Sequence, residues 1–227
     1  MQERSCIIIG AAEQGPDRTL LAEYADLDGQ NRALVICADG GFRHAETLGL
    51  KPDCLIGDFD SLKEEGWQIP KDCSGKSGQL NIKRLKTEKD ETDLFACVLE
   101  GLRGGFNDFI LIYCTGGRLD HFMGAVAVLE YIFKQGAKGI ILDTQNEMTI
   151  LKDGTLILDK KTRFPYLSIL PLDSKLVGVS ITGVKYPLCD AVLYREIGLG
   201  ISNEIMESQA TIRIDSGTAL IIRSRDQ

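Results

Sequence analysis

Short apolar runs alternate with stretches of helical spacing over the first 145 residues. The apolar runs, which we predict to be strands, lie at 6–9, 33–37, 54–56, 80–85, 109–113 and 139–142. Apolar residues at helical spacing predict helices over 17–27, 42–48, 62–66, 92–102 and 122–135. Strands that alternate with helices are typical of an α/β fold with a mainly parallel sheet and helices on both faces, a Rossmann-like arrangement.

The pattern changes after about residue 145, where short strand-like runs follow one another without a strong helix between them. These runs lie at 148–151, 155–158, 167–170, 178–182, 210–214 and 219–223. Asp153-Gly154 and Ser216-Gly217 separate neighbouring runs and are typical turn dipeptides. The sequence therefore predicts a C-terminal antiparallel β-sandwich, and we divide the chain into domains 1–145 and 146–227.

Composition argues against two classes of binding partner, nucleic acids and membranes. The formal net charge of −7 opposes non-specific binding to nucleic acid or to an anionic membrane. No apolar run approaches the length of a membrane span. The seven cysteines include no C-x-x-C pair, and several lie in apolar runs, as is typical of free thiols in a reducing compartment. We therefore expect a cytoplasmic protein without a nucleic-acid or membrane partner, in which any phosphate-bearing ligand is held locally.

Polar side chains directly follow three of the predicted strands. They are Asp39 after 33–37, Asp58 and Asp60 after 54–56, and Arg118, Asp120 and His121 after 109–113. The carboxyl ends of parallel strands share one edge of the sheet, where open α/β sheets bind their ligands. In extended backbone, Asp58 and Asp60 would point to the same side, and clusters of oxygen ligands suit Mg²⁺. The sequence therefore predicts that these side chains converge on a magnesium–phosphate site.

A second polar cluster precedes the helix predicted over 92–102 and interleaves bases with acids between Lys83 and Asp93. Asp90 and Asp93 resemble a capping pair, because acids in a first helical turn complement the helix dipole. Metal-bridged phosphates attract both signs, with bases on phosphate oxygens and carboxylates on the cation. Gly116-Gly117, just before Arg118, would let the backbone approach a phosphate at a helix N-terminus.

Several other site types lack support in the sequence. The first strand is followed by Gly10-Ala11-Ala12-Glu13 rather than by the G-x-G-x-x-G pattern of a dinucleotide-binding enzyme. Gly75-Lys76-Ser77 resembles the end of a P-loop, but the glycine that this motif requires at position 70 is Pro70. No His or Cys pair has the spacing of zinc ligands, and His121 is a better functional candidate than His44.

Taken together, these motifs resemble the thiamine pyrophosphokinase family. The matching segments are Ala38-Asp39-Gly40-Gly41, Gly57-Asp58-Phe59-Asp60-Ser61, Asp90-x-Thr92-Asp93, Gly117-Arg118-Leu119-Asp120-His121, Lys185-Tyr186-Pro187-Leu188 and Ser202-Asn203-Glu204. Their order and spacing match over nearly the whole chain. The resemblance implies an ATP-binding catalytic domain followed by a β-sandwich that binds thiamine and dimerises, so that the protein works as a homodimer.

The resemblance also implies the reaction. The hydroxyethyl oxygen of thiamine attacks the β-phosphorus of ATP, the pyrophosphoryl group moves as a unit, and AMP leaves. The expected catalytic and Mg²⁺-binding acids are Asp58, Asp60, Asp93 and Asp120. The expected nucleotide- and substrate-binding residues are Asp39, Gly40, Thr92, Arg118, His121, Ser202 and Asn203. Either Asp93 or Asp60 is expected to accept the proton of the thiamine hydroxyl.

Two other hypotheses use the same residues. Asp58-x-Asp60 after an apolar strand resembles the motif of haloacid-dehalogenase-type phosphohydrolases, although that motif normally follows the first strand. A nucleotide or thiamine sensor would bind the same ligands without turnover. The identity of the products separates the three hypotheses.

Overall fold

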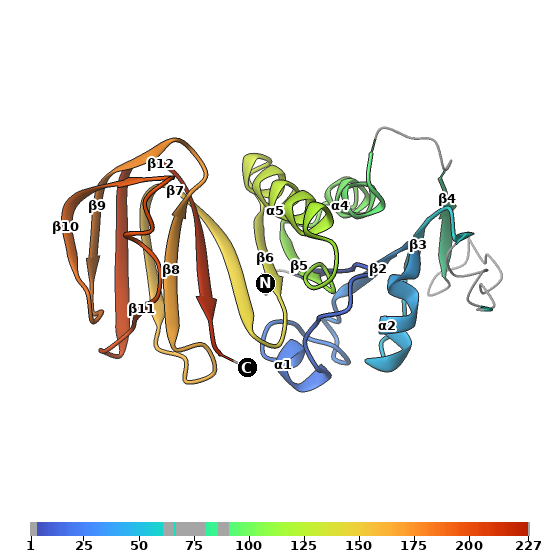
Figure 1. The fold of residues 1–227 in the computed structure, drawn as a ribbon. Helices are drawn as coiled ribbons and strands as arrows, with labels where there is room; N and C mark the ends of the chain where they lie inside the picture. The colour runs from blue at the N-terminus through green and yellow to red at the C-terminus, as the bar shows by residue number, and fades with distance from the viewer. Residues whose placement is uncertain (1–3, 61–65, 67–79, 86–90, 227) are drawn as a thin grey trace. The chain divides into compact units, whose positions relative to one another are not determined.

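The computed structural model describes residues 4–60, 66, 80–85 and 91–226 (Figure 1). The chain divides into two compact units, Met1–Thr144 and Gln145–Gln227. Most of the helix predicted over 62–66 lies outside the described residues, as do the segments 67–79 and 86–90.

The first unit is built on a parallel sheet. Its strands are β1 (Cys6–Ile9), β2 (Leu34–Ala38), β3 (Cys54–Gly57), β4 (Asn81–Arg84), β5 (Asp108–Ile112) and β6 (Lys138–Leu142). They lie in the order β6-β5-β1-β2-β3-β4, and every neighbouring pair is parallel. The chain runs outward from β1 to β4 and then returns to β5 on the other side of β1. The topological switch point therefore lies between β1 and β5, where this class of sheet binds ligands.

Helices cover both faces of this sheet. They are α1 (Arg18–Ala22), the 3₁₀ turn η1 (Asp39–Gly41), α2 (Phe42–Thr47), α4 (Asp93–Arg103) and α5 (Leu119–Lys134). Helices α4 and α5 lie on one face and α1 and α2 on the other, as right-handed crossovers require when the chain reverses direction across the sheet (Figure 1). All four helices lie within predicted ranges or close to them, but α1 has only 5 residues of the range predicted over 17–27.

The second unit consists of antiparallel strands. They are β7 (Asn146–Asp159), β8 (Tyr166–Pro171), β9 (Lys175–Thr182), β10 (Leu188–Tyr194), β11 (Asn203–Glu204) and β12 (Gln209–Ser224). Strand β12 pairs with β7 along most of its length, with β9 through its first part and with β8 through its last part. Strand β10 extends the first group through β9, and β11 extends the second through β8. The long strand β12 thus connects the other strands of the unit, whose hydrophobic core includes Leu167, Val179 and Ile212.

Two predicted strand breaks in this unit are wrong. The runs at 148–151 and 155–158 form the single strand β7, and those at 210–214 and 219–223 form the single strand β12. Asp153 has a φ of 41° and Gly217 a φ of 117°, and the Gly217 N–H donates to Asp153 Oδ1 at 2.7 Å. The register between β7 and β12 shifts between Ile214 and Thr218. The turn-like dipeptides therefore mark facing irregularities in two continuous strands.

Candidate active site

Asp39 lies near two acids from other elements, Asp58 and Asp93, whose charges act on it. Strand β2 leads directly into Asp39, β3 ends one residue before Asp58, and Asp93 is the first residue of α4. A Cβ atom at Gly57 would lie 2.9 Å from Asp39 Cα, so only glycine permits this approach of the two loops. Burial raises the pKa of Asp39, and the charges of Asp58 and Asp93 raise it further. Asp39 and Asp58, two of the acids predicted to converge, therefore lie close together, and Asp93, which the sequence placed in a separate polar cluster, lies near them.

The turn that carries Asp58 and Asp60 is tighter than the sequence suggested. Phe59 has a φ of 63° and a fully buried side chain, so the premise of extended backbone at this turn is wrong. The Phe59 N–H donates to Asp39 Oδ1 at 3.0 Å, and the Asp60 N–H donates to Asp58 Oδ1 at 3.2 Å. The Arg84 guanidinium lies 5.5 Å from the centre of the Phe59 ring. Asp58 is thereby fixed by the turn, whereas Asp60 is exposed.

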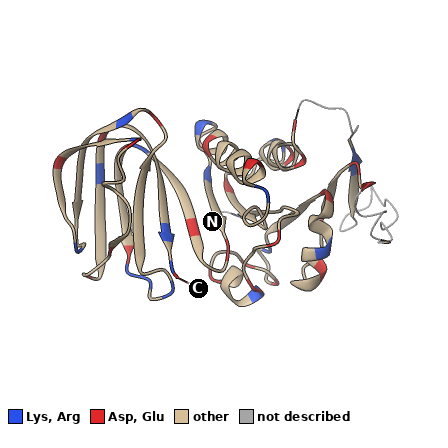
Figure 2. Ribbon diagram, in the orientation of Figure 1, with Lys and Arg blue, Asp and Glu red and all other residues tan. Residues whose placement is uncertain are grey.

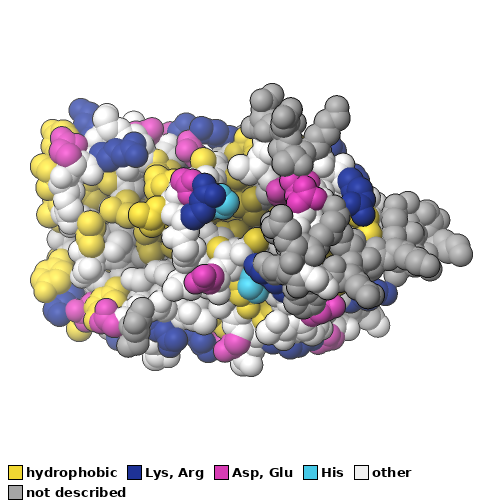
Figure 3. Space-filling view, turned by 45° about the vertical axis from the view of Figure 1, so that its right-hand side comes forward, with side chains coloured by type: hydrophobic (Ala, Val, Ile, Leu, Met, Phe, Trp, Pro, Cys, Tyr) yellow, Lys and Arg dark blue, Asp and Glu magenta, His cyan; other side chains and the backbone are white. Residues whose placement is uncertain are grey.

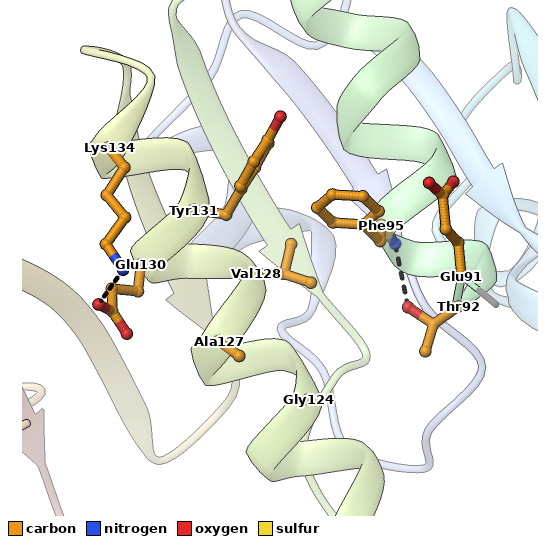
Figure 4. A pocket seen from close by; sticks show the side chains of 9 residues that line it. All are labelled: Glu91, Thr92, Phe95, Gly124, Ala127, Val128, Glu130, Tyr131 and Lys134. Atoms are coloured by element: carbon orange, nitrogen blue, oxygen red, sulfur yellow. Dashed lines mark hydrogen bonds and ion pairs between the residues drawn. The ribbon is translucent and has the colours of Figure 1, made fainter.

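Thr92 caps the helix that carries Asp93. The Thr92 Oγ1 atom accepts a hydrogen bond from the Phe95 N–H at 3.2 Å, as Figure 4 shows. The predicted capping partner Asp90 lies outside the described residues. A threonine hydroxyl that accepts from the backbone still has its own proton to donate. Thr92 therefore presents a hydrogen-bond donor at the positive end of the α4 dipole, next to Asp93.

A groove of about 470 Å³ runs between α4 and α5 (Figure 4). It is lined by Glu91, Thr92, Phe95, Gly124, Ala127, Val128, Glu130, Tyr131 and Lys134. The Phe95 and Tyr131 rings pack edge to face with their centres 4.8 Å apart, and Lys134 pairs with Glu130 at 2.6 Å. Thr92 is the only predicted site residue in this lining, so the groove meets the candidate site at the N-terminus of α4.

Arg118, Asp120 and His121 form a second polar group, after β5. Gly116 and Gly117, with φ values of 80° and 76°, turn the chain into α5, of which Arg118 is the N-cap. Arg118 binds Asp120 through two hydrogen bonds, Nη2 to Oδ2 at 2.6 Å and Nε to Oδ1 at 3.1 Å. These bonds lower the pKa of Asp120 to about 2. Asp120 is therefore ionised at neutral pH, and both side chains are exposed to a ligand.

His121 lies in the first turn of α5, next to Asp120. Its N–H donates to Asp120 Oδ1 at 3.0 Å, and its side chain is exposed. Figure 3 shows imidazole, acidic and basic side chains close together on one face of the molecule. Figure 2 shows the two signs of charge interspersed over the described part of the chain.

The carboxylates do not form a ready-made ligand cage. Within residues 4–60, 66, 80–85 and 91–226, no group of three or more His, Cys, Asp or Glu side chains is arranged to hold a metal ion. Mg²⁺, however, usually keeps several waters and is bound by one or two carboxylates together with substrate phosphates. The mutual repulsion that raises the pKa of Asp39 is the kind of strain that a cation relieves. The donor set thus fits a magnesium ion that arrives with phosphates.

One feature that the sequence did not predict is a stacked pair of rings, His44 and Tyr113. The His44 and Tyr113 rings are stacked with their centres 3.8 Å apart and their planes 8° apart. Burial lowers the pKa of His44, and nearby Arg43 lowers it further, so the imidazole is neutral at pH 7. Tyr113 follows β5 directly and has a φ of 55°. No sequence signal joins these two residues, because they lie on different elements.

Two weak sequence motifs of the second unit form one structure. The buried Asn203 side chain accepts from the Tyr186 N–H at 3.0 Å and donates to the Tyr186 carbonyl at 2.8 Å. Lys185 pairs with Glu204 at 2.7 Å. Ser202 has a φ of 58°, and its N–H donates to the Ser168 hydroxyl at 3.1 Å. Asn203 therefore fixes the loop from within, while the Ser202 side chain is exposed.

Comparison with known proteins covers both units. The family description "Thiamin pyrophosphokinase, catalytic domain" matches residues 29–141, and "Thiamin pyrophosphokinase, vitamin B1 binding domain" matches residues 155–219. A thiamine pyrophosphokinase of Bacillus subtilis is 32% identical over 208 residues, covering 91% of this chain and 92% of the relative. A thiamine pyrophosphokinase of Oryza sativa is 27% identical over 224 residues, covering 88% and 82%.

Solved structures agree with these matches. The crystal structure of thiamine pyrophosphokinase from Bacillus subtilis superposes with a TM-score of 0.82 at 27% identity, covering 98% of this chain and all of the other. That of thiamin pyrophosphokinase from Geobacillus thermodenitrificans gives 0.80 at 27% identity, with 98% of each chain covered. Because both family domains match in order and the fold is shared over nearly the full length, the chain belongs to the thiamine pyrophosphokinase family.

Proposed function

We propose that this chain transfers the pyrophosphoryl group of ATP to the hydroxyl of thiamine at the carboxyl edge of the parallel sheet. The products are thiamine diphosphate and AMP. Family membership supports the overall conversion of thiamine to thiamine diphosphate with ATP. The location of the site rests on one observation: Asp58 and Asp93, from two different elements, both lie near Asp39. In this assignment the first unit binds ATP and carries out catalysis.

The proposed site residues fall into two groups, those that bind the cation and those that bind the nucleotide. Asp58, Asp60, Asp93 and Asp120 face the cation and the triphosphate. Asp39 and Gly40 shape the turn after β2, while Thr92, Arg118 and His121 offer donors to the nucleotide. Phosphoryl transfer requires mainly that the protein position the reactants in line and neutralise charge. These acids and hydrogen-bond donors supply both.

Magnesium is the cation that we propose here. Asp58 and Asp93 are the acids best placed to hold it, since both act on Asp39. When bound, Mg²⁺ would polarise phosphate oxygens and stabilise negative charge on the departing AMP. The chain's own contribution is to fix the carboxylates by the Phe59 turn and by the Thr92 cap.

The proton of the thiamine hydroxyl needs an acceptor. Asp120 is a poor one, because Arg118 lowers its pKa to about 2 and holds both of its oxygens. Asp93 and Asp60 remain the candidates for a general base. Asp60 is exposed on the turn after β3, and Asp93 lies half-buried at the start of α4.

We assign thiamine binding and dimerisation to the second unit. The match of residues 155–219 to a vitamin B1 binding domain supports the first role. The second is supported by apolar side chains along the segment 194–201, where Tyr194, Ile197, Leu199 and Ile201 are between 43% and 56% exposed. Such a surface is typical of an interface, here with a second copy of the chain.

A cytoplasmic location is part of the same proposal. The cysteines within the described residues are free thiols, and burial raises the pKa of Cys114 to about 12. Buried, protonated thiols are typical of proteins that remain in a reducing compartment. Among the described helices, none combines the length and the apolar character that crossing a bilayer requires.

Product analysis tests the proposed function directly. The chain is incubated with ATP, Mg²⁺ and thiamine, and the products are identified by mass spectrometry. We expect AMP and thiamine diphosphate in equal amounts, and no turnover when EDTA replaces Mg²⁺. ADP or free phosphate as the main product would overturn pyrophosphoryl transfer and favour a phosphohydrolase. Ligand binding without AMP formation would favour a sensor.

A further inference from the structure

A buried hydrogen bond lies behind the loop that carries Arg118. The Thr115 hydroxyl donates to Asp143 Oδ2 at 2.6 Å. Asp143 directly follows β6 and is fully buried, and Thr115 is 5% exposed. A carboxylate in such a position depends on hydrogen-bond donors, because its desolvation is otherwise uncompensated. The carboxyl ends of β5 and β6 are therefore joined by side chains as well as by backbone pairing.

Thr115 also joins this pair to the loop after β1. The Gln14 N–H donates to the Thr115 carbonyl at 3.1 Å, and the two residues form an antiparallel bridge. A Cβ atom at Gly116 would lie 2.8 Å from Gln14 Cγ, so the next residue also packs against this loop. Thr115 is thus held on two sides at the topological switch point.

Only two residues separate Thr115 from Arg118. Both are glycines with left-handed φ values, 80° at Gly116 and 76° at Gly117. Glycine has more accessible backbone conformations than any other residue. Two consecutive glycines therefore fix the position of the next residue only if both ends of the turn are anchored. Arg118 is the N-cap of α5, yet its side chain makes no capping hydrogen bond. The position of Arg118 therefore depends on the anchor at Thr115 and on the helix that follows.

We propose that Asp143, acting through Thr115, is a positioning residue that holds the glycine turn and thereby sets Arg118 and Asp120 against the triphosphate. The hydrogen bond fixes the start of the turn, and α5 fixes its end. This inference rests on the proposed function, because it places Arg118 at the nucleotide.

Kinetics of two Thr115 variants test the role of the hydroxyl. Thr115→Val keeps the shape of the side chain and removes the donor, whereas Thr115→Ser keeps the donor. We expect Thr115→Val to lower kcat/KM for ATP by roughly 10- to 100-fold, the scale of a small misplacement of a catalytic group. Thr115→Ser should retain most of the wild-type value. Wild-type kinetics in Thr115→Val, or equal losses in both variants, would overturn the proposal.

A double-mutant cycle with Arg118→Ala shows whether Thr115 acts through Arg118. If it does, Thr115→Val has little further effect on kcat/KM once Arg118 is gone. Multiplicative effects of the two changes would overturn the positioning role even if each variant is impaired. If Arg118→Ala alone keeps wild-type kinetics, the role proposed for Arg118 fails as well. The cycle thus separates failure of the inference from failure of the proposed site.

Ser5→Ala is the matched control. The Ser5 hydroxyl donates to Asp108 Oδ2 at 2.5 Å, joining β1 and β5 at the opposite edge of the same sheet. We expect Ser5→Ala to lower Tm and leave kcat/KM unchanged. A loss of kcat/KM equal to that of Thr115→Val would show that general destabilisation explains both.

A second substitution covers the case in which Thr115→Val does not fold. Asp143→Asn keeps an acceptor oxygen of the same size for Thr115 and removes the charge that strengthens the bond. It should lower kcat/KM less than Thr115→Val, and this loss should also disappear in the Arg118→Ala background. Wild-type kinetics in Asp143→Asn would overturn the role of Asp143.

Discussion

Asp39 is a carboxyl group whose ionisation is opposed by its burial and by two neighbouring acids. Its Oδ1 atom accepts the Phe59 N–H, while burial and the charges of Asp58 and Asp93 raise its pKa. In the unfolded chain the same group titrates near its ordinary value of 3.8. The folded state therefore keeps this proton to higher pH than the unfolded state does. Stability falls as pH rises from the ordinary pKa through the raised one, because ionisation is less favourable in the folded protein.

Asp39→Asn should remove this pH dependence. Asparagine keeps an oxygen that accepts the Phe59 N–H but cannot ionise. We expect the variant to melt at a higher temperature than the wild type at pH 7, with the difference shrinking toward pH 3.5. Thermal melts at several pH values without Mg²⁺ measure it. A constant difference across this range would show that ionisation of Asp39 has no effect on stability.

Asp58 should be essential for transfer and dispensable for folding. The turn that holds it is set by Phe59 and Asp39, and its own carboxylate is assigned to the cation. Asp58→Asn should therefore abolish formation of thiamine diphosphate while the circular dichroism spectrum stays native. The matched control is Asp28→Asn, the same change at an exposed acid that pairs with Arg18. Activity close to the wild type in Asp58→Asn would refute the metal assignment.

At the scale of the element, two helix caps allow an effect on stability to be distinguished from an effect on catalysis. Asp17 Oδ1 accepts the Leu20 N–H at 2.7 Å, and Thr92 Oγ1 accepts the Phe95 N–H at 3.2 Å. Asp17→Ala and Thr92→Ala should each destabilise the fold by about 1 kcal/mol, measured by urea unfolding. Only Thr92→Ala should lower kcat, because only Thr92 is assigned to the nucleotide. Equal kinetic losses in both variants would remove Thr92 from the site.

Local pattern predicted the elements of the first unit better than those of the second. Every described strand of the parallel sheet lies within two residues of its prediction, because buried strands read as short apolar runs. Asp153 and Gly217 were wrongly predicted to end strands. Each stands in a continuous strand, and the two are joined by a hydrogen bond across the β7–β12 pair. Strand β10 was missed, since Cys189 and Asp190 leave its start polar and exposed.

Local sequence pattern also predicted part of the arrangement of the candidate site. Asp39 and Asp58 were predicted to lie close together because polar residues that follow parallel strands share an edge of the sheet, and they do lie close together. The left-handed Phe59 between the acids was not predicted, because its conformation depends on the Asp39 carboxylate 20 residues earlier. Asn203 was expected at the ligand, yet its amide is bound to the backbone of Tyr186. Such long-range hydrogen bonds leave no local sequence signal.

For the whole molecule, the exposed apolar segment 194–201 predicts self-association. Leu199, which is 55% exposed, lies within it. Light scattering should give the mass of a dimer for the wild type and a smaller mass for Leu199→Glu, since a buried charge opposes an apolar interface. Ile157→Glu, at a residue of similar exposure on β7, is the control and should remain dimeric. A monomeric wild type at micromolar concentration would contradict the proposed homodimer.

The pairing of β7 with β12 affects the order in which the chain folds during synthesis. The parallel sheet of the first unit has all its described strands once residue 142 is free of the ribosome. The second unit must wait for residues 209–224, because β12 is the partner of β7, β8 and β9 alike. A nascent chain that pauses before residue 209 therefore exposes unpaired β-strand edges, which are prone to aggregate. Translation speed between residues 146 and 224 is thus expected to affect the yield of folded protein.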